Sequence, residues 1–420
     1  MIKRFLKRLG RRQAEPAPSA DQPIDVRQFM AQHSVEEFNE AAENFFAKNV
    51  GNTAYYLKKP LGNAAEASQH LMFFAEMLGG LKPLPGMRLL DFGASTCWTS
   101  RYFAEFKLKV IACDVSPTAL SIGKQLFSRN PVVDSPFKPE FSVFNGRRLD
   151  LPDESVDRIA CFDAFHRVAN PQEVLREFAR VLKPGGIAGF SGPGPKHSQT
   201  AQSQLEMKNH GLVQNDTVLE EIWPMAQEAG FTDIQVAVLN TAPFTLGLEE
   251  FNTLARKKRS KPLLAYAEQV RRRAADRRLF FLRKGAAAPP DSRDPAGLLC
   301  EIGVELSSAQ AHTHGWVEGL AVARNSGTAR WLSSEALFGA VKLGIHLRTA
   351  EGDLLNRDFG RAKLPPGRSV EPGETVEIPF RIMAPAKRGE YLLEFDLVSE
   401  NVCWFEANGA RPFAAALRVE

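Results

Sequence analysis

Short apolar runs alternate with amphipathic segments between residues 87 and 283. The apolar runs read MRLLDF, VIACD, FSVFN, DRIACF and GIAGF, and segments with helical spacing of apolar residues lie between them at 96–106, 117–129 and 171–182. A further helix at 217–229 and strands at 234–239 and 278–283 complete the series. This alternation predicts an α/β fold with a mostly parallel sheet and helices on both faces.

One predicted helical region precedes this series of strands and helices, and another interrupts it. The segments 26–33, 35–48 and 64–81 carry apolar residues three and four positions apart, which predicts an N-terminal set of helices. A helical insertion at about 248–278 contains the basic runs RKKRSK and RRRAADRR. We interpret these runs either as a solvated helix face or as a site for a phosphate-bearing or anionic-lipid substrate.

The pattern changes after the segment GAAAPPDSRDPA, whose composition is typical of a linker. From there to the C-terminus, runs that alternate apolar and polar residues are divided by Gly, Pro and Asn turns, which predicts an antiparallel β-sandwich. We therefore expect a basic N-terminus with a linker at 1–24, an α/β domain at 25–285, a linker at 286–296 and a β-sandwich at 297–420.

Charge and composition exclude several classes of protein. The 53 basic and 49 acidic residues leave a net charge of +4, without the concentrated basic excess of a nucleic-acid-binding protein. No apolar run approaches the roughly 20 residues of a membrane span. The five cysteines form no CxxC pair, and no His, Asp or Glu cluster has the spacing of metal ligands. We therefore expect no nucleic-acid partner, no disulfide framework, no bound metal, and a cytoplasmic location.

The N-terminus MIKRFLKRLGRRQ departs from this neutral average. Its cations and its apolar residues at helical spacing give two open interpretations. Residues 1–13 either form a weak anchor on an anionic membrane surface, which would hold the protein at the inner face of the plasma membrane, or remain a disordered basic tail.

The run LLDFGASTCW places Asp91 and Gly93 where an apolar strand turns into a helix. Gly93 permits a tight turn and the close approach of a ligand, and the following helix offers unpaired N–H groups. The next strand ends in Asp114, about 20 residues further on, where a carboxylate is positioned to accept from ribose hydroxyls. Asp114 also suits the cap of the helix that opens at Pro117, and the two roles are compatible.

Residues from about 85 to 190 resemble class I S-adenosylmethionine-dependent methyltransferases, in particular the type 11 group. LLDFGASTCW is similar to the family's first motif and ACDVS to its second, while LDLPDESVDRIACFDAFHRV and EVLREFARVLKPGGIAGFS are similar to the segments around the fourth and fifth strands. The resemblance implies a Rossmann-like sheet, S-adenosyl-L-methionine as cofactor and methyltransferase activity. A dinucleotide-dependent dehydrogenase fits less well, because the loop lacks G-x-G-x-x-G.

The resemblance also implies which residues hold the cofactor. Asn145 stands where the family usually has an Asp that binds adenine, and Cys161 ends the fourth strand beneath the reacting sulfonium. Ser95 and Cys97 replace two of the three glycines usual in the first motif. The candidate cofactor-binding residues are Asp91, Gly93, Ser95, Asp114, Val115, Asn145, Gly146 and Cys161.

Methyl transfer to a hydroxyl is helped by a general base. His166 and His197 follow the fourth and fifth predicted strands, at the sheet edge where substrate is expected, and Asp163 either orients one of them or acts alone. The alternative for His166 is a packing or hydrogen-bonding role at a helix start. Tyr55 and Tyr56 belong either to a lid over the cofactor or to helix packing.

The C-terminal region resembles the small β-sandwich appended to proteins of bacterial surface-polysaccharide assembly. VARNSGTARW and the tail DLVSENVCWFEANGARPF carry the resemblance. Trp331, Trp404 and Phe405 either stack on sugar rings or belong to the sandwich core.

Together these features predict an S-adenosyl-L-methionine-dependent methyltransferase that O-methylates a sugar or a lipid-linked glycan in envelope polysaccharide synthesis. One alternative is an inactive, cofactor-binding scaffold that binds glycan, which the altered glycine loop favours. The other is a methyltransferase for a protein or small metabolite, with the sandwich as an interaction or dimerisation module. The sequence leaves the oligomeric state open.

Overall fold

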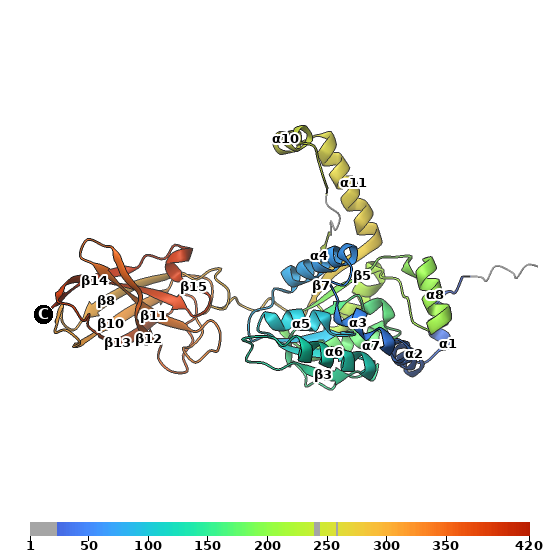
Figure 1. The fold of residues 1–420 in the computed structure, drawn as a ribbon, viewed down its shortest axis with the longest axis horizontal. Helices are drawn as coiled ribbons and strands as arrows, with labels where there is room; N and C mark the ends of the chain where they lie inside the picture. The colour runs from blue at the N-terminus through green and yellow to red at the C-terminus, as the bar shows by residue number, and fades with distance from the viewer. Residues whose placement is uncertain (1–22, 239–243, 258) are drawn as a thin grey trace, which may run out of the picture.

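The computed structural model describes residues 23–238, 244–257 and 259–420. The basic segment 1–13, for which a membrane anchor is one interpretation, therefore lies outside the described residues. An α/β part and a β-sandwich lie one after the other along the longest axis of the molecule (Figure 1).

The α/β part is built on a seven-stranded sheet of order β3-β2-β1-β4-β5-β7-β6. The strands β1 to β5 run parallel, whereas β7 is antiparallel to both β5 and β6. The bounds are β1 Arg88–Phe92, β2 Lys109–Asp114, β3 Glu140–Val143, β4 Val156–Phe162, β5 Leu182–Pro193, β6 Asp233–Ala237 and β7 Arg277–Arg283. The predicted mostly parallel sheet is confirmed.

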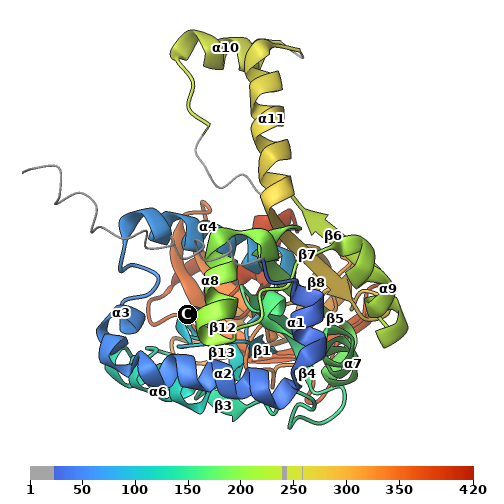
Figure 2. The same ribbon diagram turned by 90° about the vertical axis from the view of Figure 1, so that its right-hand side faces the viewer.

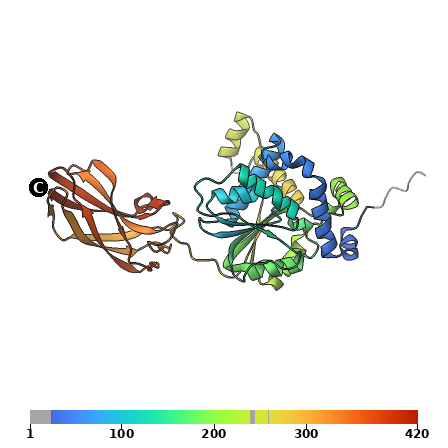
Figure 3. The same ribbon diagram turned by 60° about the horizontal axis from the view of Figure 1, so that its bottom comes forward.

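Helices cover both faces of this sheet (Figure 3). The helices α4 (Ala64–Leu81) and α5 (Trp98–Glu105) bury Phe73, Met77 and Phe103 against one face, and α7 (Pro171–Val181) and α9 (Leu219–Ala229) bury Phe178 and Ile222 against the other. Because both faces are covered, the central strands are apolar almost throughout, as parallel strands usually are.

The remaining helices lie around this core. They are α1 Val26–Gln32, α2 Val35–Lys48, α3 Thr53–Leu57, α6 Pro117–Arg129 and α8 Ala201–His210. The helix α2 begins at a capping box, in which the Ser34 hydroxyl accepts from the N–H of Glu37 and the Glu37 carboxylate accepts from the N–H of Ser34. No pattern in the sequence predicted α3 or α8, which are short or weakly amphipathic.

Two helices, α10 (Leu248–Arg256) and α11 (Lys261–Asp276), project from the body of the α/β part as an arm (Figures 1 and 2). They lie between β6 and β7 in the chain, where the sequence predicted a helical insertion. Among the described residues of the two helices, Pro262 is the only one that is buried. We call α10 and α11 the helical arm.

The C-terminal part is an antiparallel β-sandwich, as predicted. A three-stranded sheet of order β13-β10-β8 packs on a six-stranded sheet, in which five strands follow the order β12-β11-β14-β16-β9 and the sixth, β15, pairs with β14. The bounds are β8 Cys300–Leu306, β9 Gln310–Ala311, β10 Trp316–Asn325, β11 Val341–Thr349, β12 Leu354–Lys363, β13 Thr375–Met383, β14 Gly389–Ser399, β15 Cys403–Trp404 and β16 Phe413–Val419. A short 3₁₀ helix, η4 (Phe405–Asn408), follows β15.

Within the three described ranges of the chain, no helix combines the length and the hydrophobicity that crossing a bilayer requires.

Candidate functional site

A cavity of about 520 Å³ lies at the carboxyl ends of β1, β2 and β4, and we call it the sheet-edge cavity. In the sheet order, β2 and β3 lie on one side of β1 while β4 and β5 lie on the other, so the strand order reverses between β1 and β4. Such a reversal leaves a crevice outside the strand ends, where α/β sheets bind ligands. The volume is in the range of small-molecule sites, roughly 300–1,000 Å³.

The loop after β1 forms part of the cavity wall. Gly93, Ser95 and Cys97 all have positive φ, at 69°, 51° and 62°. A Cβ on Gly93 would lie 2.2 Å from the Cβ of Ala164, so only glycine fits there. The two positions where the family's first motif usually has further glycines therefore keep a left-handed backbone, although Ser95 and Cys97 occupy them.

Asp114 ends β2 and lines the cavity. Its Oδ2 accepts from the backbone N–H of Ser95 at 2.8 Å, and its Oδ1 accepts from the N–H of Ser116 at 2.9 Å. Burial raises the pKa of this carboxyl above its ordinary value, while the two backbone donors act in the opposite direction. Each oxygen keeps acceptor capacity beyond its one backbone bond, which suits a pair of hydroxyls on a ligand.

Asp91 is almost fully buried and is not part of the cavity wall. Its Oδ2 accepts from the hydroxyls of Thr99 at 2.7 Å and Ser100 at 2.5 Å, both on α5. Burial raises the pKa of Asp91 to about 6. The carboxylate therefore ties the start of α5 to β1, and the structure does not give it the direct cofactor contact that the sequence predicted.

Gly146 and Val115 both line the cavity, as expected for cofactor-binding residues. A Cβ on Gly146 would lie 2.5 Å from side-chain atoms of Val35 and Asn39, so the absent side chain lets α2 approach. Asn145 is different, because its Oδ1 accepts from the backbone N–H groups of Arg147 and Arg148 and its side chain lies outside the cavity wall. The structure thus does not place Asn145 where it would meet an adenine ring.

Cys161 is also outside the wall. Its side chain is fully buried in the core beneath the sheet edge, and burial raises the pKa of its thiol well above the ordinary value. Asp163, two residues later, does line the cavity. Its backbone has a φ of 50°, and its carboxylate pairs with Arg277 at 2.5 Å.

His166 and His197 lie together but away from the cavity. Their rings meet edge to face with centroids 5.1 Å apart, and neither residue lines the cavity. Nε2 of His197 is 2.9 Å from Oε1 of Gln214. Burial drives the pKa of His166 well below its ordinary value, with the neighbouring cations adding to that effect. The geometry therefore supports the packing alternative for His166 and leaves His197 without access to a substrate in the cavity.

The N-terminal helices bring two further chemical groups to the cavity, Lys59 and His70. Burial lowers the pKa of His70, with the charge of Lys59 as the next cause, and Nδ1 of His70 is buried without a hydrogen bond. Burial likewise lowers the pKa of Lys59, which Glu66 and Asp163 partly counteract. The sequence did not predict either role. The pattern of α4 is that of an ordinary amphipathic helix, and only the packing of the N-terminal segments against the sheet edge brings Lys59 and His70 to the cavity.

Aromatic side chains cover much of the rest of the wall. Tyr55 and Tyr56, weighed as lid or packing residues, both line the cavity, and Nζ of Lys59 lies 5.6 Å and 5.9 Å from their ring centroids. Trp98 and Phe162 meet edge to face in the wall at 5.3 Å. The cavity therefore has an aromatic roof from the N-terminal helices and polar groups from the strand ends.

The three aromatic residues of the sandwich that the sequence singled out lie in two environments, the core and the outer side of a sheet. Trp331 and Phe405 are fully buried and pack edge to face at 5.5 Å, so they belong to the core. Trp404 lies on the outer side of the six-stranded sheet, with its ring centroid 4.2 Å from that of His346. The core interpretation thus holds for two of the three.

Residues 90–190 match the family model described as a methyltransferase domain. This segment runs from the end of β1 through β5 and contains Gly93, Asp114 and Asp163, whereas Lys59 and His70 precede it. The match covers the strand ends that form the floor of the sheet-edge cavity.

Two curated relatives and one solved structure illustrate the similarity. A demethylmenaquinone methyltransferase of Renibacterium salmoninarum is 34% identical over 135 residues, which are 31% of this chain and 53% of the relative. The mitochondrial ubiquinone biosynthesis O-methyltransferase of Schizosaccharomyces pombe is 24% identical over 154 residues, covering 37% and 52%. The chain thus spans about half the length of the curated relatives it matches. The solved phosphoethanolamine N-methyltransferase 2 of Haemonchus contortus is 17% identical, with an alignment that covers 55% of this chain and 59% of that chain and a TM-score of 0.37.

Proposed function

We propose, from the premise that residues 90–190 form a methyltransferase domain, that the chain transfers a methyl group from S-adenosyl-L-methionine to an acceptor held in the sheet-edge cavity. The observation that carries the proposal is the carboxylate of Asp114, which ends β2 in the cavity wall beside a loop that keeps three left-handed residues.

The residues of the cavity fit this cofactor. The missing side chains at Gly93 and Gly146 let Ala164 and α2 close on the cavity wall, where a Cβ would clash with them. Asp114 offers acceptor oxygens to the ribose hydroxyls, and Val115 stands beside it in the wall. The loop geometry argues against the alternative of an inactive scaffold, because Ser95 and Cys97 adopt the left-handed backbone that glycine favours.

When bound, S-adenosyl-L-methionine supplies a methyl group on a positively charged sulfur. The chain's own contribution is to position an acceptor oxygen in line with that group and to exclude water. The oxygen–carbon bond forms as the carbon–sulfur bond breaks, the electron pair of the broken bond stays on sulfur, and the acceptor's proton passes to a base. We assign the base to His70, because it lines the cavity and its lowered pKa keeps it neutral and able to accept a proton. Asp163 lines the same cavity, but its carboxylate is paired with Arg277.

For the acceptor we propose a sugar hydroxyl, as in a lipid-linked glycan of envelope polysaccharide synthesis. Lys59, Asp163, Arg167 and Glu206 all line the cavity, and such a charged set suits several hydroxyls better than the hydrocarbon tail of a quinol. The aromatic roof suits the apolar C–H face of a pyranose. The resemblance of the sandwich to polysaccharide-assembly domains supports the same class of acceptor.

A quinol is the second candidate, because curated relatives carry quinone-related names. The two are separated by incubating the full chain with labelled S-adenosyl-L-methionine and either an extract of lipid-linked glycans or a demethylated quinol, followed by mass spectrometry. A gain of one methyl on glycan supports the proposal, a gain on quinol replaces the glycan, and no gain on either acceptor contradicts both assignments.

We also propose that the protein works at an anionic membrane surface and that the helical arm makes the contact. Leu248, Phe251 and Leu264 on the arm are 76%, 57% and 71% exposed. Exposed cations stand at the turn between the two helices: Arg256, Lys257, Arg259 and Lys261. Exposed apolar side chains beside Lys and Arg are the combination that interfacial helices use.

A further inference from the structure

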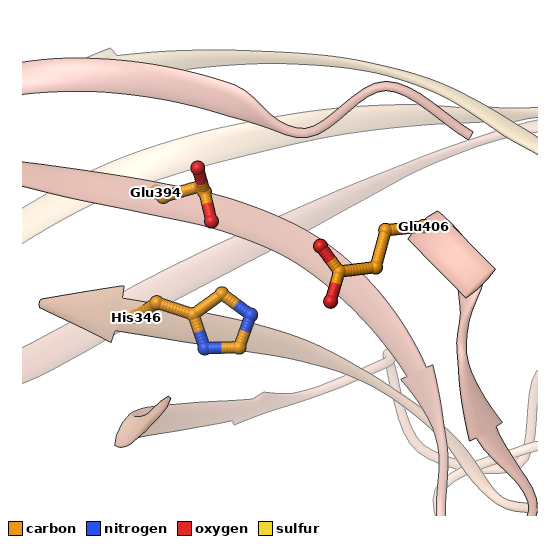
Figure 4. A group of neighbouring side chains, drawn as sticks. All are labelled: His346, Glu394 and Glu406. Carbon is orange, nitrogen blue, oxygen red and sulfur yellow. The ribbon is translucent and has the colours of Figure 1, made fainter. Parts of the chain in front are cut away.

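The sandwich holds a cluster of three side chains outside its core, well away from the sheet-edge cavity. His346 on β11 and Glu394 on β14 are direct cross-strand partners, and Glu406 comes from η4. One potential ligand atom from each lies within 4.8 Å of the others. Figure 4 shows the imidazole and the two carboxylates converging from these three elements. The sequence predicted no metal site because these residues are far apart in the chain.

Each of the three side chains is held by a second group through one of its two polar atoms. Nδ1 of His346 contacts the carbonyl oxygen of Arg357. A carbonyl only accepts, so this contact places a proton on Nδ1, and in the neutral ring Nε2 is the nitrogen that can bind a metal ion.

The carboxylates repeat this arrangement. Oε1 of Glu394 accepts from Arg348 at 2.8 Å, and Oε1 of Glu406 accepts from Arg357 at 2.9 Å. Among the described residues, these hydrogen bonds engage one oxygen of each carboxylate, and Oε2 of each is available for another partner. Outer partners of this kind, on backbone carbonyls and charged side chains, orient the ligands of protein metal sites.

The imidazole is enclosed, with only 1% of His346 exposed. The ring centroid of Trp404 lies 4.2 Å from that of His346. The guanidinium of Arg361 lies in turn 4.5 Å from the centroid of the Trp404 ring. Because Nδ1 is engaged by the carbonyl of Arg357, Nε2 is the ring nitrogen that faces the carboxylate of Glu406 (Figure 4). An imidazole nitrogen beside two carboxylates is a donor arrangement that suits a bound cation.

We propose that His346, Glu394 and Glu406 bind one divalent transition-metal ion, with zinc as the best fit. One imidazole nitrogen with two carboxylate oxygens is a donor set that Zn²⁺ accepts with a water in the fourth position, whereas Ca²⁺ and Mg²⁺ favour all-oxygen sites. Such an ion joins η4 to β11 and β14. The site therefore stabilises the sandwich, and this role is independent of methyl transfer.

The test is a calorimetric titration of the metal-free full chain with ZnCl₂. We expect one tight equivalent, and we expect His346→Gln to weaken it about 100-fold or more, since a ligand is worth at least as much as an outer-shell partner. Glu406→Gln provides a second, less buried variant. His312→Gln is the matched control, because His312 is an exposed histidine of the same sandwich outside the cluster.

Circular dichroism establishes that the variants are folded, and Co²⁺ provides a second readout through the visible absorption of a four-coordinate ion. The proposal is overturned if the wild type takes up no zinc, or if His346→Gln binds as the wild type does. It is also overturned if His312→Gln loses the binding equally, since the ion would then sit elsewhere. A loss confined to His346→Gln and Glu406→Gln supports it.

Discussion

The backbone N–H of Ser95 donates to Oδ2 of Asp114 across 2.8 Å, which joins the loop after β1 to the acid that ends β2. Ser95 makes this bond from a left-handed backbone with a φ of 51°, so the loop and the acid are joined in the cavity wall. A change at either residue is therefore transmitted to the other.

Ser95→Gly should stabilise the α/β part by about 1 kcal/mol, because a left-handed backbone is unfavourable for a residue with a Cβ and free of this cost for glycine. Thermal or urea unfolding followed by tryptophan fluorescence measures the change. Ser95→Ala keeps the Cβ and should give no such gain. A loss of stability in Ser95→Gly would mean that the left-handed loop is not the native backbone.

His70→Gln should lower kcat by about 10²–10⁴-fold if His70 takes the acceptor's proton. His197→Gln is the control and should leave kcat nearly unchanged, since His197 does not line the cavity. In the wild type, the fall of kcat/KM on acidification should lie below pH 6.5, the ordinary value for histidine, because burial lowers the pKa of His70. Equal loss in both variants, or an acidic limb that His70→Gln leaves in place, would point to another base.

Asp91→Asn should change how stability depends on pH. Burial raises the pKa of Asp91 from 3.8 to about 6, so the folded state disfavours the charged carboxylate. The stability that the protonated group contributes is fully present below pH 3.8 and is lost as the pH rises through about 6. The unfolding free energy of Asp91→Asn minus that of the wild type should therefore rise by about 2.4 kcal/mol between pH 4 and 7. A difference that does not vary with pH would show that the carboxyl titrates normally.

The helical arm should bind vesicles that contain anionic phospholipid and should not bind vesicles of neutral phospholipid alone. Leu248→Ser combined with Leu264→Ser should weaken co-sedimentation by about tenfold or more, because each leucine loses apolar burial in the interface. Leu337→Ser is the control, since Leu337 is 62% exposed on the sandwich.

Binding to anionic vesicles should also fall as salt rises. The membrane proposal is wrong if the protein binds neither kind of vesicle. If it instead forms a dimer that the double substitution dissociates, a second copy of the chain covers the arm.

The parallel strands and the functional residues at their ends could be predicted from the sequence. Such strands are apolar almost throughout, and residues such as Gly93 and Asp114 mark where they end. Edge strands are harder. The sequence of β12, LLNRDFGRAK, went unnoticed because it lies at the edge of its sheet, where charged residues are normal.

The direction of single side chains was the weaker part of the prediction. Position near a strand end brought Cys161 and His166 into the list of candidates, but Cys161 points into the core and His166 packs against His197 behind the wall. Conversely, Lys59 and His70 reach the cavity through the packing of N-terminal helices, a long-range contact that no local pattern encodes.

Titration of S-adenosyl-L-methionine into the full chain tests the central claim most directly. We expect one equivalent to bind the wild type and Asp114→Asn to bind about 10–100-fold more weakly, since a hydrogen bond to a charged group is worth about 1.5–3 kcal/mol. Asp150→Asn, a change at an exposed acid, should bind as the wild type does. No binding by the wild type, or equal binding by Asp114→Asn, would contradict the account.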